Sequence, residues 1–141
     1  KLYEAGQAGV KIKIICRSRF IMKAGVPGLS ENIEAISIVD KYLEHARFCI
    51  FHHEGENLTF IGSADWQTRN IDRRVEVTCP IYRERLKRKL HDIFEIQWND
   101  NYKARIIDAE MNNNFKSKNG DEKTNRSQDA VYEYLLKNNK A

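Results

Sequence analysis

The strongest constraint on the fold is an order of elements, in which three short strand-like segments are followed directly by a longer segment with helical periodicity. Residues 46–53 (ARFCIFHH) and 58–64 (LTFIGSA) have the β-branched and aromatic content of strands and flank a turn, EGEN. Residues 73–79 (RRVEVTC) predict a third strand that ends at Pro80. In residues 82–98, apolar side chains repeat at steps of three and four, as in an amphipathic helix. We therefore expect a small sheet with one face covered by that helix.

The first part of the chain adds a helix, a strand and a loop. Residues 1–7 have a helical composition that stops near Gly9, and residues 10–16 (VKIKIIC) alternate like a strand. Residues 18–32 contain two glycines and a proline and predict a loop. Residues 33–45 are ambiguous, because their apolar spacing fits a helix while their Ile and Val content fits a strand. We favour a helix for their second half, and an α/β fold class for the chain.

The domain organisation follows from changes in composition. We expect one domain over residues 1–111, then a flexible connector over residues 112–129, which are rich in Asn, Lys, Ser and Gly. Residues 130–141 regain apolar side chains and predict a short terminal helix. No apolar run approaches the roughly 18 residues that a membrane span needs. The first residues resemble the end of a helix running into a strand, so we expect a fragment of a longer protein.

The basic residues are more informative for their positions than for their number. A formal net charge of +4 is compatible with an ordinary basic surface. Several basic residues, however, lie at or near the ends of predicted strands, where binding sites are commonly built. They are Arg17, Arg19, Lys23, Arg47, Arg69, Arg73 and Arg74. This placement favours an anionic ligand.

The cysteines and two of the histidines predict no metal site. Cys16, Cys49 and Cys79 are odd in number, far apart and without C-x-x-C spacing. We expect buried reduced thiols rather than a disulfide or a zinc site. His52 and His53 fall at the predicted turn, where exposure to solvent is expected over metal binding.

An ordered pair of motifs beginning at His45 carries the functional argument. His45-x-Arg47 is followed by a strand, a turn, a second strand and then the sequence G-S-A-D at residues 62–65. This order resembles the half-site of the phospholipase D superfamily, where an H-x-K element is followed by a G-S-x-N element and a charged strand. Arg47 stands where the superfamily usually has Lys, and Asp65 stands where it usually has Asn. These two departures argue against the hydrolase chemistry of that superfamily.

Five sequence blocks, in order, resemble a narrower family over nearly the whole chain. They are KLYEAGQAGVKIKIICR, GVPGLSENI, SIVDKYLEHARFCIF, SADWQTRNIDRRVEV and RSQDAVYEYL. They look like consecutive blocks of the last domain of bacterial polyphosphate kinase, the type related to phospholipase D. The resemblance implies an α/β fold, namely the second phospholipase D-like domain of that enzyme, with a small mixed sheet flanked by helices.

The resemblance also implies an activity. The family reversibly transfers the terminal phosphate of ATP to inorganic polyphosphate through a phosphohistidine carried by the preceding domain, so this chain alone is expected to be inactive. Mg²⁺ is the implied cofactor, arriving with ATP and held mainly by ligands outside this chain. The implied partners are ATP or ADP, polyphosphate, the preceding domains and further copies of the full-length enzyme, without specific nucleic acid. The implied location is the cytoplasm, with peripheral association with the inner membrane as a further expectation.

Individual residues take roles from the same resemblance. Arg17 matches an arginine that binds nucleotide or polyphosphate phosphates, and His45 matches a histidine that contacts the transferring phosphate opposite the phosphorylated histidine. Residue chemistry supports both roles, because a guanidinium fits phosphate geometry and an imidazole titrates near neutrality. Ser18 and Ala24 replace the family's usual Gly and Pro, which alters loop geometry rather than charge. Residues expected to support the site are Arg47, Ser63, Asp65, Arg69, Arg73 and Arg74.

Other interpretations remain open at this point. His45 could be the nucleophile of a phospholipase D-like phosphodiesterase that works as a symmetric dimer. The chain could instead be a non-catalytic polyanion-binding module, in which the arginines act by counterion release. At the level of single residues, His45 could be a solvated or capping side chain, and the charges of residues 72–76 could form a cross-strand ladder. The lack of aromatic stacking motifs argues against nucleic acid as the ligand.

Overall fold

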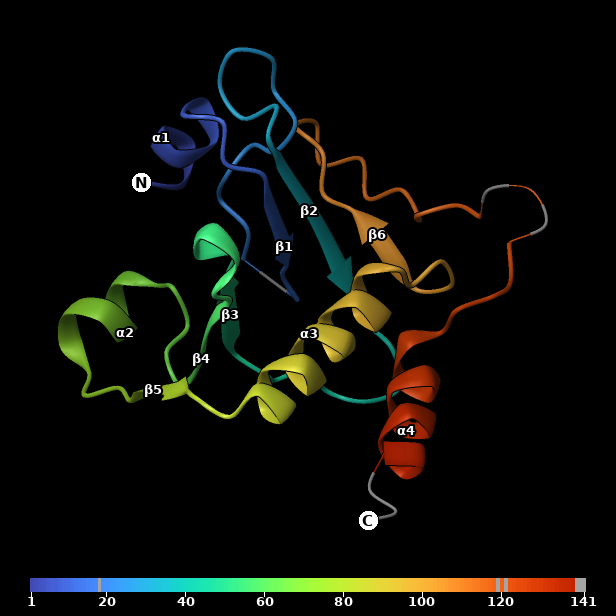
Figure 1. The fold of residues 1–141 in the computed structure, drawn as a ribbon. Helices are drawn as coiled ribbons and strands as arrows, with labels where there is room; N and C mark the ends of the chain where they lie inside the picture. The colour runs from blue at the N-terminus through green and yellow to red at the C-terminus, as the bar shows by residue number, and fades with distance from the viewer. Residues whose placement is uncertain (18, 119, 121, 139–141) are drawn as a thin grey trace. The chain divides into compact units, whose positions relative to one another are not determined.

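The computed structural model describes residues 1–17, 19–118, 120 and 122–138. The chain forms two compact units (Figure 1). The first unit contains Lys1–Glu44 and the segment from Glu95 onward, and the second contains His45–Phe94. Each unit is described by itself below.

The first unit is built on a mixed three-stranded sheet in the order β1-β2-β6. Strand β1 (Ile12–Ile15) runs parallel to β2 (Ile33–Ile38), with Ile12 opposite Ile33. Strand β6 (Ala104–Ile106) runs antiparallel to β2 on its other side. Helix α1 (Leu2–Gln7) precedes β1. The central position of β2 explains why four of its six residues are buried, in keeping with a β-branched, apolar sequence.

The core of the first unit centres on Ile33, whose side chain is fully buried together with Ala24 and Ala35. Apolar side chains from α1, β1, the loop after β1 and the residue after β6 pack against these three: Leu2, Tyr3, Ile12, Ile14, Phe20, Met22 and Ile107. Ser30 closes that loop by donating to the carbonyl of Lys23 at 2.6 Å and accepting from the amide of Val26 at 3.1 Å. The predicted loop is therefore an ordered cover over the end of the sheet.

The second unit contains an antiparallel sheet in the order β3-β4-β5. Strands β3 (Phe48–Phe51) and β4 (Leu58–Gly62) are joined across the short 3-10 helix η1 (His53–Gly55). Helix α2 (Thr68–Arg73) separates β4 from β5 (Thr78–Ile81). Gly62 lies where the chain leaves β4, and a Cβ there would lie 3.2 Å from both the Thr78 hydroxyl and the Val77 carbonyl. A side chain at this position would force the two strands apart.

Two longer helices complete the chain (Figure 1). Helix α3 (Glu84–Trp98) begins in the second unit, where Phe94 meets Phe48 edge to face at 6.4 Å between ring centroids. Helix α4 is formed by Ser127–Asn138, and residues 139–141, which were included in the predicted terminal helix, lie outside the described residues. None of the helices in the described ranges is both long enough and apolar enough to span a bilayer.

The structure confirms the predicted α/β class, the strand in residues 10–16, the hairpin around EGEN and the amphipathic helix in residues 82–98. The helix favoured for the second half of residues 33–45 is wrong, because β2 extends to Ile38 and residues 40–44 are bends and coil. Pairing with β1 and β6 on both sides selects the strand over the helical spacing. Strand β6 and helix α2 were not predicted.

The third predicted strand is displaced along the sequence. Residues up to Arg73 belong to α2, and β5 starts at Thr78 and includes Pro80. Pro80 fits because β5 is the edge strand of its sheet. The amide of Ser63 donates to the carbonyl of Val77, and because hydrogen-bonded and non-hydrogen-bonded pairs alternate, Phe60 and Pro80, three pairs further along the ladder, form a non-hydrogen-bonded pair. The nitrogen of Pro80 therefore faces away from β4, where no ladder bond is lost.

Two smaller predictions also change. Helix α4 begins at Ser127, so residues 127–129 are helical rather than part of the connector. Cys16 and Cys49 are half-buried and Cys79 is exposed, so the expectation of three buried thiols is wrong for Cys79. Burial raises the pKa of the Cys49 thiol. Ser18, one of the two departures from the family pattern, lies outside the described residues.

Candidate functional site

Arg17 follows the end of β1, where the amide of Cys16 extends the pairing to the carbonyl of Ile36. Its side chain is exposed, and its Nη1 donates to the backbone carbonyl of Glu44 at 2.5 Å. Within the described part of the chain, Arg17 makes no ion pair. A carbonyl is a neutral partner, so it orients the guanidinium without neutralising it. The charge of Arg17 is therefore available to an anion.

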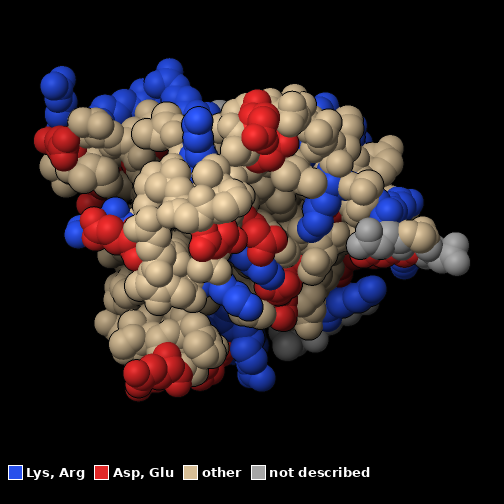
Figure 2. Space-filling view, turned by 90° about the horizontal axis from the view of Figure 1, so that it is seen from above, with Lys and Arg blue, Asp and Glu red and all other residues tan. Residues whose placement is uncertain are grey.

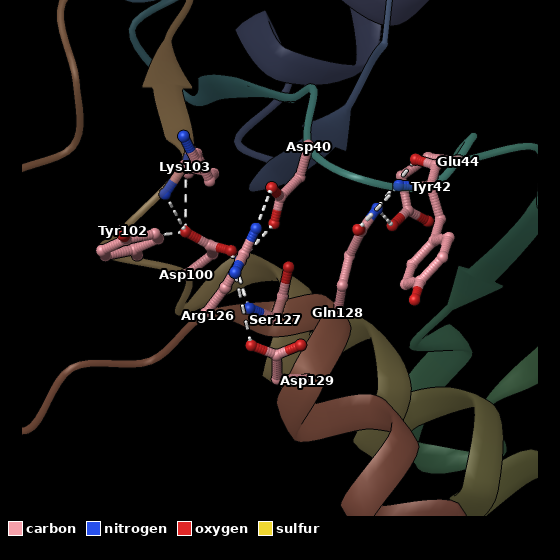
Figure 3. Close-up of polar contacts among 11 residues, drawn as sticks. Asp40, Tyr42, Glu44, Asp100, Tyr102, Lys103, Arg126, Ser127, Gln128 and Asp129 are labelled. Atoms are coloured by element: carbon pink, nitrogen blue, oxygen red, sulfur yellow. Dashed lines mark hydrogen bonds and ion pairs between the residues drawn. The ribbon is translucent and has the colours of Figure 1, made fainter.

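Glu44, which supplies that carbonyl, is itself held by two side-chain amides. Gln97 at the end of α3 donates to one carboxylate oxygen at 3.0 Å, and Gln128 in α4 donates to the other at 2.8 Å. Figure 3 shows Gln128 reaching from the first turn of α4 toward Glu44 and Tyr42. Glu44 is therefore only partly exposed, and both of its carboxylate oxygens have partners. The partner of Arg17 is a fixed part of the first unit.

The first turn of α4 holds the whole of residues 40–44. Arg126 binds Asp40 with two parallel hydrogen bonds of 2.7 and 2.6 Å (Figure 3). Gln128 pairs with the peptide of Tyr42, accepting from its amide at 3.0 Å and donating to its carbonyl at 2.9 Å. The hydrogen bond from Arg126 holds the pKa of Asp40 below its usual value, despite opposition from burial. The side-chain amide of Gln128 thus makes the same two hydrogen bonds to the backbone of Tyr42 that a peptide of a neighbouring strand would make.

Asp100 anchors the same region from the loop after α3. Its carboxylate is completely buried and accepts from the amides of Tyr102, Lys103 and Ala104 at 2.7–3.0 Å, and from the amide of Ser127 at 2.8 Å (Figure 3). Burial opposes the ionisation of Asp100, but the backbone donors outweigh it, and its pKa lies below the usual value. Asp100 therefore accepts a hydrogen bond from the first amide of α4 and fixes the position at which the helix starts.

In the second unit, His45, Arg47, Asp65 and Arg69 form a continuous cluster. The Nη1 and Nη2 atoms of Arg47 lie 3.3 and 3.1 Å from Nδ1 and Nε2 of the exposed His45 ring. The Nε of Arg47 donates to Asp65 at 2.7 Å, and Arg69 lies 3.8 Å from the other oxygen of Asp65. The hydrogen bond from Arg47 lowers the pKa of Asp65. We refer to these four residues as the His45 cluster.

Ser63, one of the residues expected to support the site, is hydrogen-bonded within the second unit. Its hydroxyl donates to the carboxylate of Glu76 and accepts from the amide of Val77 at 3.1 Å. Asn70 donates to the second oxygen of Glu76 at 2.7 Å. The hydrogen bonds from Ser63 and Asn70 lower the pKa of Glu76. Ser63 therefore ties the segment after α2 to the end of β4.

Arg73 and Arg74 lie apart from these contacts. Arg73 is the last residue of α2, Arg74 follows it, and both are exposed. Among the described residues neither makes an ion pair. Because residues 72–76 lie in α2 and an extended segment rather than on paired strands, the cross-strand ladder interpretation is wrong.

The predicted residues thus fall into separate groups. His45 joins Arg47, Asp65 and Arg69, whereas Ser63 joins Glu76, and Arg17 belongs to the first unit. Figure 2 shows acidic and basic side chains interspersed on the face that it displays. Individual arginines and their partners are therefore more informative than a single basic field.

Other candidates contribute less. His52, His53 and His91 are exposed, the first two beside η1 and the third on α3. In the ranges that the structure describes, no three His, Cys, Asp or Glu side chains are grouped so that they could hold a metal ion. A pocket of about 680 Å³ in the first unit, between β2, β6 and residues 23–27, is lined by Lys23 from the basic residues noted in the sequence, but by none of the residues assigned to or expected to support the site.

Sequence reasoning missed the residues that hold the 40–44 segment. Asp40 and Arg126 are 86 positions apart, as are Tyr42 and Gln128, and no local pattern joins them. The only available signal was that RSQDAVYEYL, which contains Arg126 and Gln128, was one of the blocks that resembled the family.

Comparisons with known proteins identify the family of this chain. A family model described as polyphosphate kinase C-terminal domain 2 matches residues 1–128. A polyphosphate kinase of Vibrio vulnificus (strain YJ016) is 50% identical over 135 residues, which are 96% of this chain and 19% of the relative. That of Escherichia coli (strain K12) is 42% identical over the same length, 20% of the relative. The crystal structure of a polyphosphate kinase from Porphyromonas gingivalis matches with a TM-score of 0.93 and 44% identity, covering 97% of this chain and 21% of that one.

The chain therefore belongs to the polyphosphate kinase C-terminal domain 2 family. It spans about a fifth of the length of the relatives that it matches. The resemblance drawn from the five sequence blocks is confirmed, and so is the α/β class with a small mixed sheet and flanking helices.

Proposed function

We propose that this chain is the C-terminal domain in the catalytic region of an ATP:polyphosphate phosphotransferase. The reaction reversibly moves the terminal phosphate of ATP to inorganic polyphosphate. In the forward direction, the bond from the γ-phosphorus to its bridging oxygen breaks as a bond to a histidine nitrogen forms, and a terminal polyphosphate oxygen then displaces that nitrogen. The histidine that carries the phosphate is assigned to the preceding domain, in keeping with the resemblance to the family; this chain spans about a fifth of the relatives that it matches.

The observation that carries the proposal is the state of Arg17. It is an exposed arginine at the end of a strand, fixed by a neutral carbonyl and left without a carboxylate partner among the described residues. Phosphoryl transfer needs positioned cations for the charge on the phosphoryl oxygens, and a planar guanidinium suits them. We assign to Arg17 the binding of nucleotide or polyphosphate phosphates.

His45 is assigned contact with the transferring phosphoryl group, on the side opposite the phosphorylated histidine. An imidazole can exchange a proton near neutral pH or stabilise negative charge when protonated. Its ring is exposed at the start of the second unit and oriented by Arg47. The role requires an accessible ring, and exposure meets that requirement.

Several further features belong to the same proposal. Mg²⁺ enters with ATP and is held mainly by residues outside this chain. ATP or ADP and polyphosphate are the substrates, and the partners are the preceding domains and other copies of the full-length enzyme. The protein functions in the cytoplasm, with peripheral association with the inner membrane.

Substitution of His45 in the full-length enzyme tests the proposal. General acid-base groups contribute about 10²–10⁴-fold in rate, so His45→Ala is expected to reduce kcat within that range while the thermal unfolding midpoint stays unchanged. His45→Gln is expected to rescue little, because an amide cannot exchange a proton near pH 7. Near-normal turnover by His45→Gln would remove the proton-transfer role.

Phosphohistidine mapping separates this function from its competitors. The isolated chain is expected to form no polyphosphate from ATP and Mg²⁺. In the full-length enzyme, label from γ-³²P-ATP is expected on a histidine outside this chain. Obligatory label on His45 would favour the phospholipase D-like phosphodiesterase mechanism. Normal turnover of the full-length enzyme with both His45→Ala and Arg17→Ala would favour a non-catalytic polyanion-binding module.

A further inference from the structure

The two positions where this sequence departs from the H-x-K and G-S-x-N pattern bind each other. The Nε of Arg47 donates to Asp65 at 2.7 Å, and the two side chains are only 25% and 34% exposed. The backbone supports the contact, because the amide of Gly62 donates to the carbonyl of Arg47 at 2.9 Å. The charge of Arg47 is therefore balanced within the protein, in contrast to that of Arg17.

The remaining nitrogens of Arg47 face the imidazole of His45. Nη1 lies 3.3 Å from Nδ1, and Nη2 lies 3.1 Å from Nε2. The two ring nitrogens point in different directions, so one guanidinium cannot make an in-plane hydrogen bond to both. Because Nη1 is close to Nδ1 and Nη2 is close to Nε2, the guanidinium lies alongside the imidazole ring. Nη1 also donates to the backbone carbonyl of His45 at 3.2 Å. Both the ring and the peptide of His45 are thus held by one side chain.

We infer that Arg47 and Asp65 are positioning residues for His45. Asp65 fixes the guanidinium of Arg47, and the guanidinium fixes the orientation of the imidazole toward the phosphoryl group. This inference rests on the role proposed for His45. It assigns no substrate contact to Arg47, because its Nε is bound to Asp65 and both Nη atoms face His45.

Arg69 supplies a matched control on the same carboxylate. It lies 3.8 Å from the other oxygen of Asp65 and its side chain is 56% exposed, so it contributes charge near Asp65 without orienting Arg47. If Asp65 acted only through the local charge balance, loss of Arg69 would matter as well. If Asp65 acts by holding Arg47, loss of Arg69 should lower kcat less than loss of Arg47.

A double-mutant cycle in the full-length enzyme tests the inference. Misplacement of a reacting group by about 1 Å can cost about 100-fold, so Asp65→Ala is expected to lower kcat by roughly 10- to 100-fold, with KM for ATP and polyphosphate changed by less than about twofold. Asp65→Asn keeps an oxygen acceptor for Arg47 and is expected to recover much of the loss. Arg69→Ala is expected to lower kcat less than Arg47→Ala does, and Asp72→Ala, at an exposed position of α2 outside the His45 cluster, is expected to stay within about twofold of the unsubstituted enzyme.

The His45→Ala background decides how Asp65 acts. A positioning residue has nothing left to position there, so adding Asp65→Ala is expected to lower kcat by less than about a further twofold. An equal loss in both backgrounds would overturn the inference, as would normal kcat for both Asp65→Ala and Arg47→Ala when His45→Ala is impaired. Normal kcat for His45→Ala would instead remove the proposed role of His45 itself. Asp65→Asn serves the same cycle if Asp65→Ala does not fold, as judged by circular dichroism.

Discussion

Two arginines of the first unit lie in opposite electrostatic settings. Arg126 donates twice to Asp40, whose side chain is 3% exposed, and the pair joins α4 to residues 40–44. Arg17 is exposed and donates to one neutral carbonyl in the same segment, that of Glu44. The difference shows that the partner, rather than the residue type, decides whether an arginine stabilises the fold or remains available to a ligand.

The partner also decides which arginines of the second unit are available to a ligand. Arg47 is bound by Asp65 and turned toward His45, so its charge is used inside the protein. Arg73 and Arg74 are exposed, with no ion pair in the described residues, but they lie outside the His45 cluster. A count of basic residues at strand ends therefore overestimates how many face a polyanion.

The largest expected effect is on stability, in the region of Arg126. Asp100→Ala removes the acceptor of four backbone amides, of which those of Ala104 and Ser127 belong to fully buried residues. At about 1–3 kcal/mol for each unsatisfied buried donor, the free energy of unfolding should fall by roughly 2–6 kcal/mol. Urea unfolding of the full-length enzyme, or of this chain if it folds alone, measures the change. Asp129→Ala, at an exposed position of α4, is the control and should change it by less than about 0.5 kcal/mol.

The next effect is on ligand binding, at Arg17. Hydrogen bonds to charged groups contribute about 1.5–3 kcal/mol, so Arg17→Ala should weaken polyphosphate binding by roughly 10- to 100-fold. The unfolding midpoint of the Arg17→Ala variant should not change, because the hydrogen bond that it loses, to the carbonyl of Glu44, is exposed. Fluorescence titration with polyphosphate at two salt concentrations measures both affinity and salt slope. Arg88→Ala, an exposed position on α3, should retain affinity, and a reversal of the two variants would contradict the assignment.

A pH titration of stability should again separate the two arginines. The pKa values of Asp40 and Asp100 are below the usual 3.8 in the folded chain, so the unfolded chain binds more protons as the pH falls. Their contribution is therefore fully present above about pH 5 and is lost as the pH falls through 3.8 toward the folded pKa values. Asp40→Asn should flatten the pH dependence of the urea midpoint, whereas Arg17→Ala should leave it unchanged. A flat profile in the unsubstituted protein would contradict the role given to these carboxylates.

The smallest expected effect is at Gln128, which contacts the segment that both Arg126 and Arg17 bind. Gln128→Ala removes the amide that pairs with the peptide of Tyr42 and holds Glu44, the partner of Arg17. Net hydrogen-bond contributions of about 1 kcal/mol predict a loss of that order in stability and a rise of a few-fold in KM for polyphosphate. Steady-state kinetics of the full-length enzyme measures the second effect. An unchanged KM alongside a lower unfolding midpoint would limit Gln128 to a structural role.

Prediction from sequence succeeded where the signal was local. The apolar spacing of residues 82–98 is complete within the helix that it predicts, and the EGEN turn lies between the two strands that it joins. Prediction from sequence failed where residues distant in the sequence determine the secondary structure. Strand β2 is an example, because it pairs with β1 and β6 on its two sides. Strand β6 contains only Ala104–Ile106, too short to produce a period of its own.

The candidate site, too, was predicted only where the signal was local or came from the family resemblance. Residue chemistry and the family resemblance singled out Arg17 and His45, while the pairing of Arg47 with Asp65 needed the register of β3 with β4. Ser63, which was expected to support the site, is bound by Glu76, a residue 13 positions later that follows an unpredicted helix. Asp40 and Gln128 carry no local signal, because their partners lie more than 80 positions away.

Pro80 has a consequence for how this chain meets other chains. Strand β5 lies at the edge of its sheet, and the nitrogen of Pro80 faces outward without a hydrogen to donate. A foreign strand aligned against this edge would find a missing donor in the middle of a four-residue strand. Edge strands interrupted in this way resist intermolecular β-sheet growth. Along its β5 edge, the sheet therefore offers little template for aggregation during synthesis and refolding.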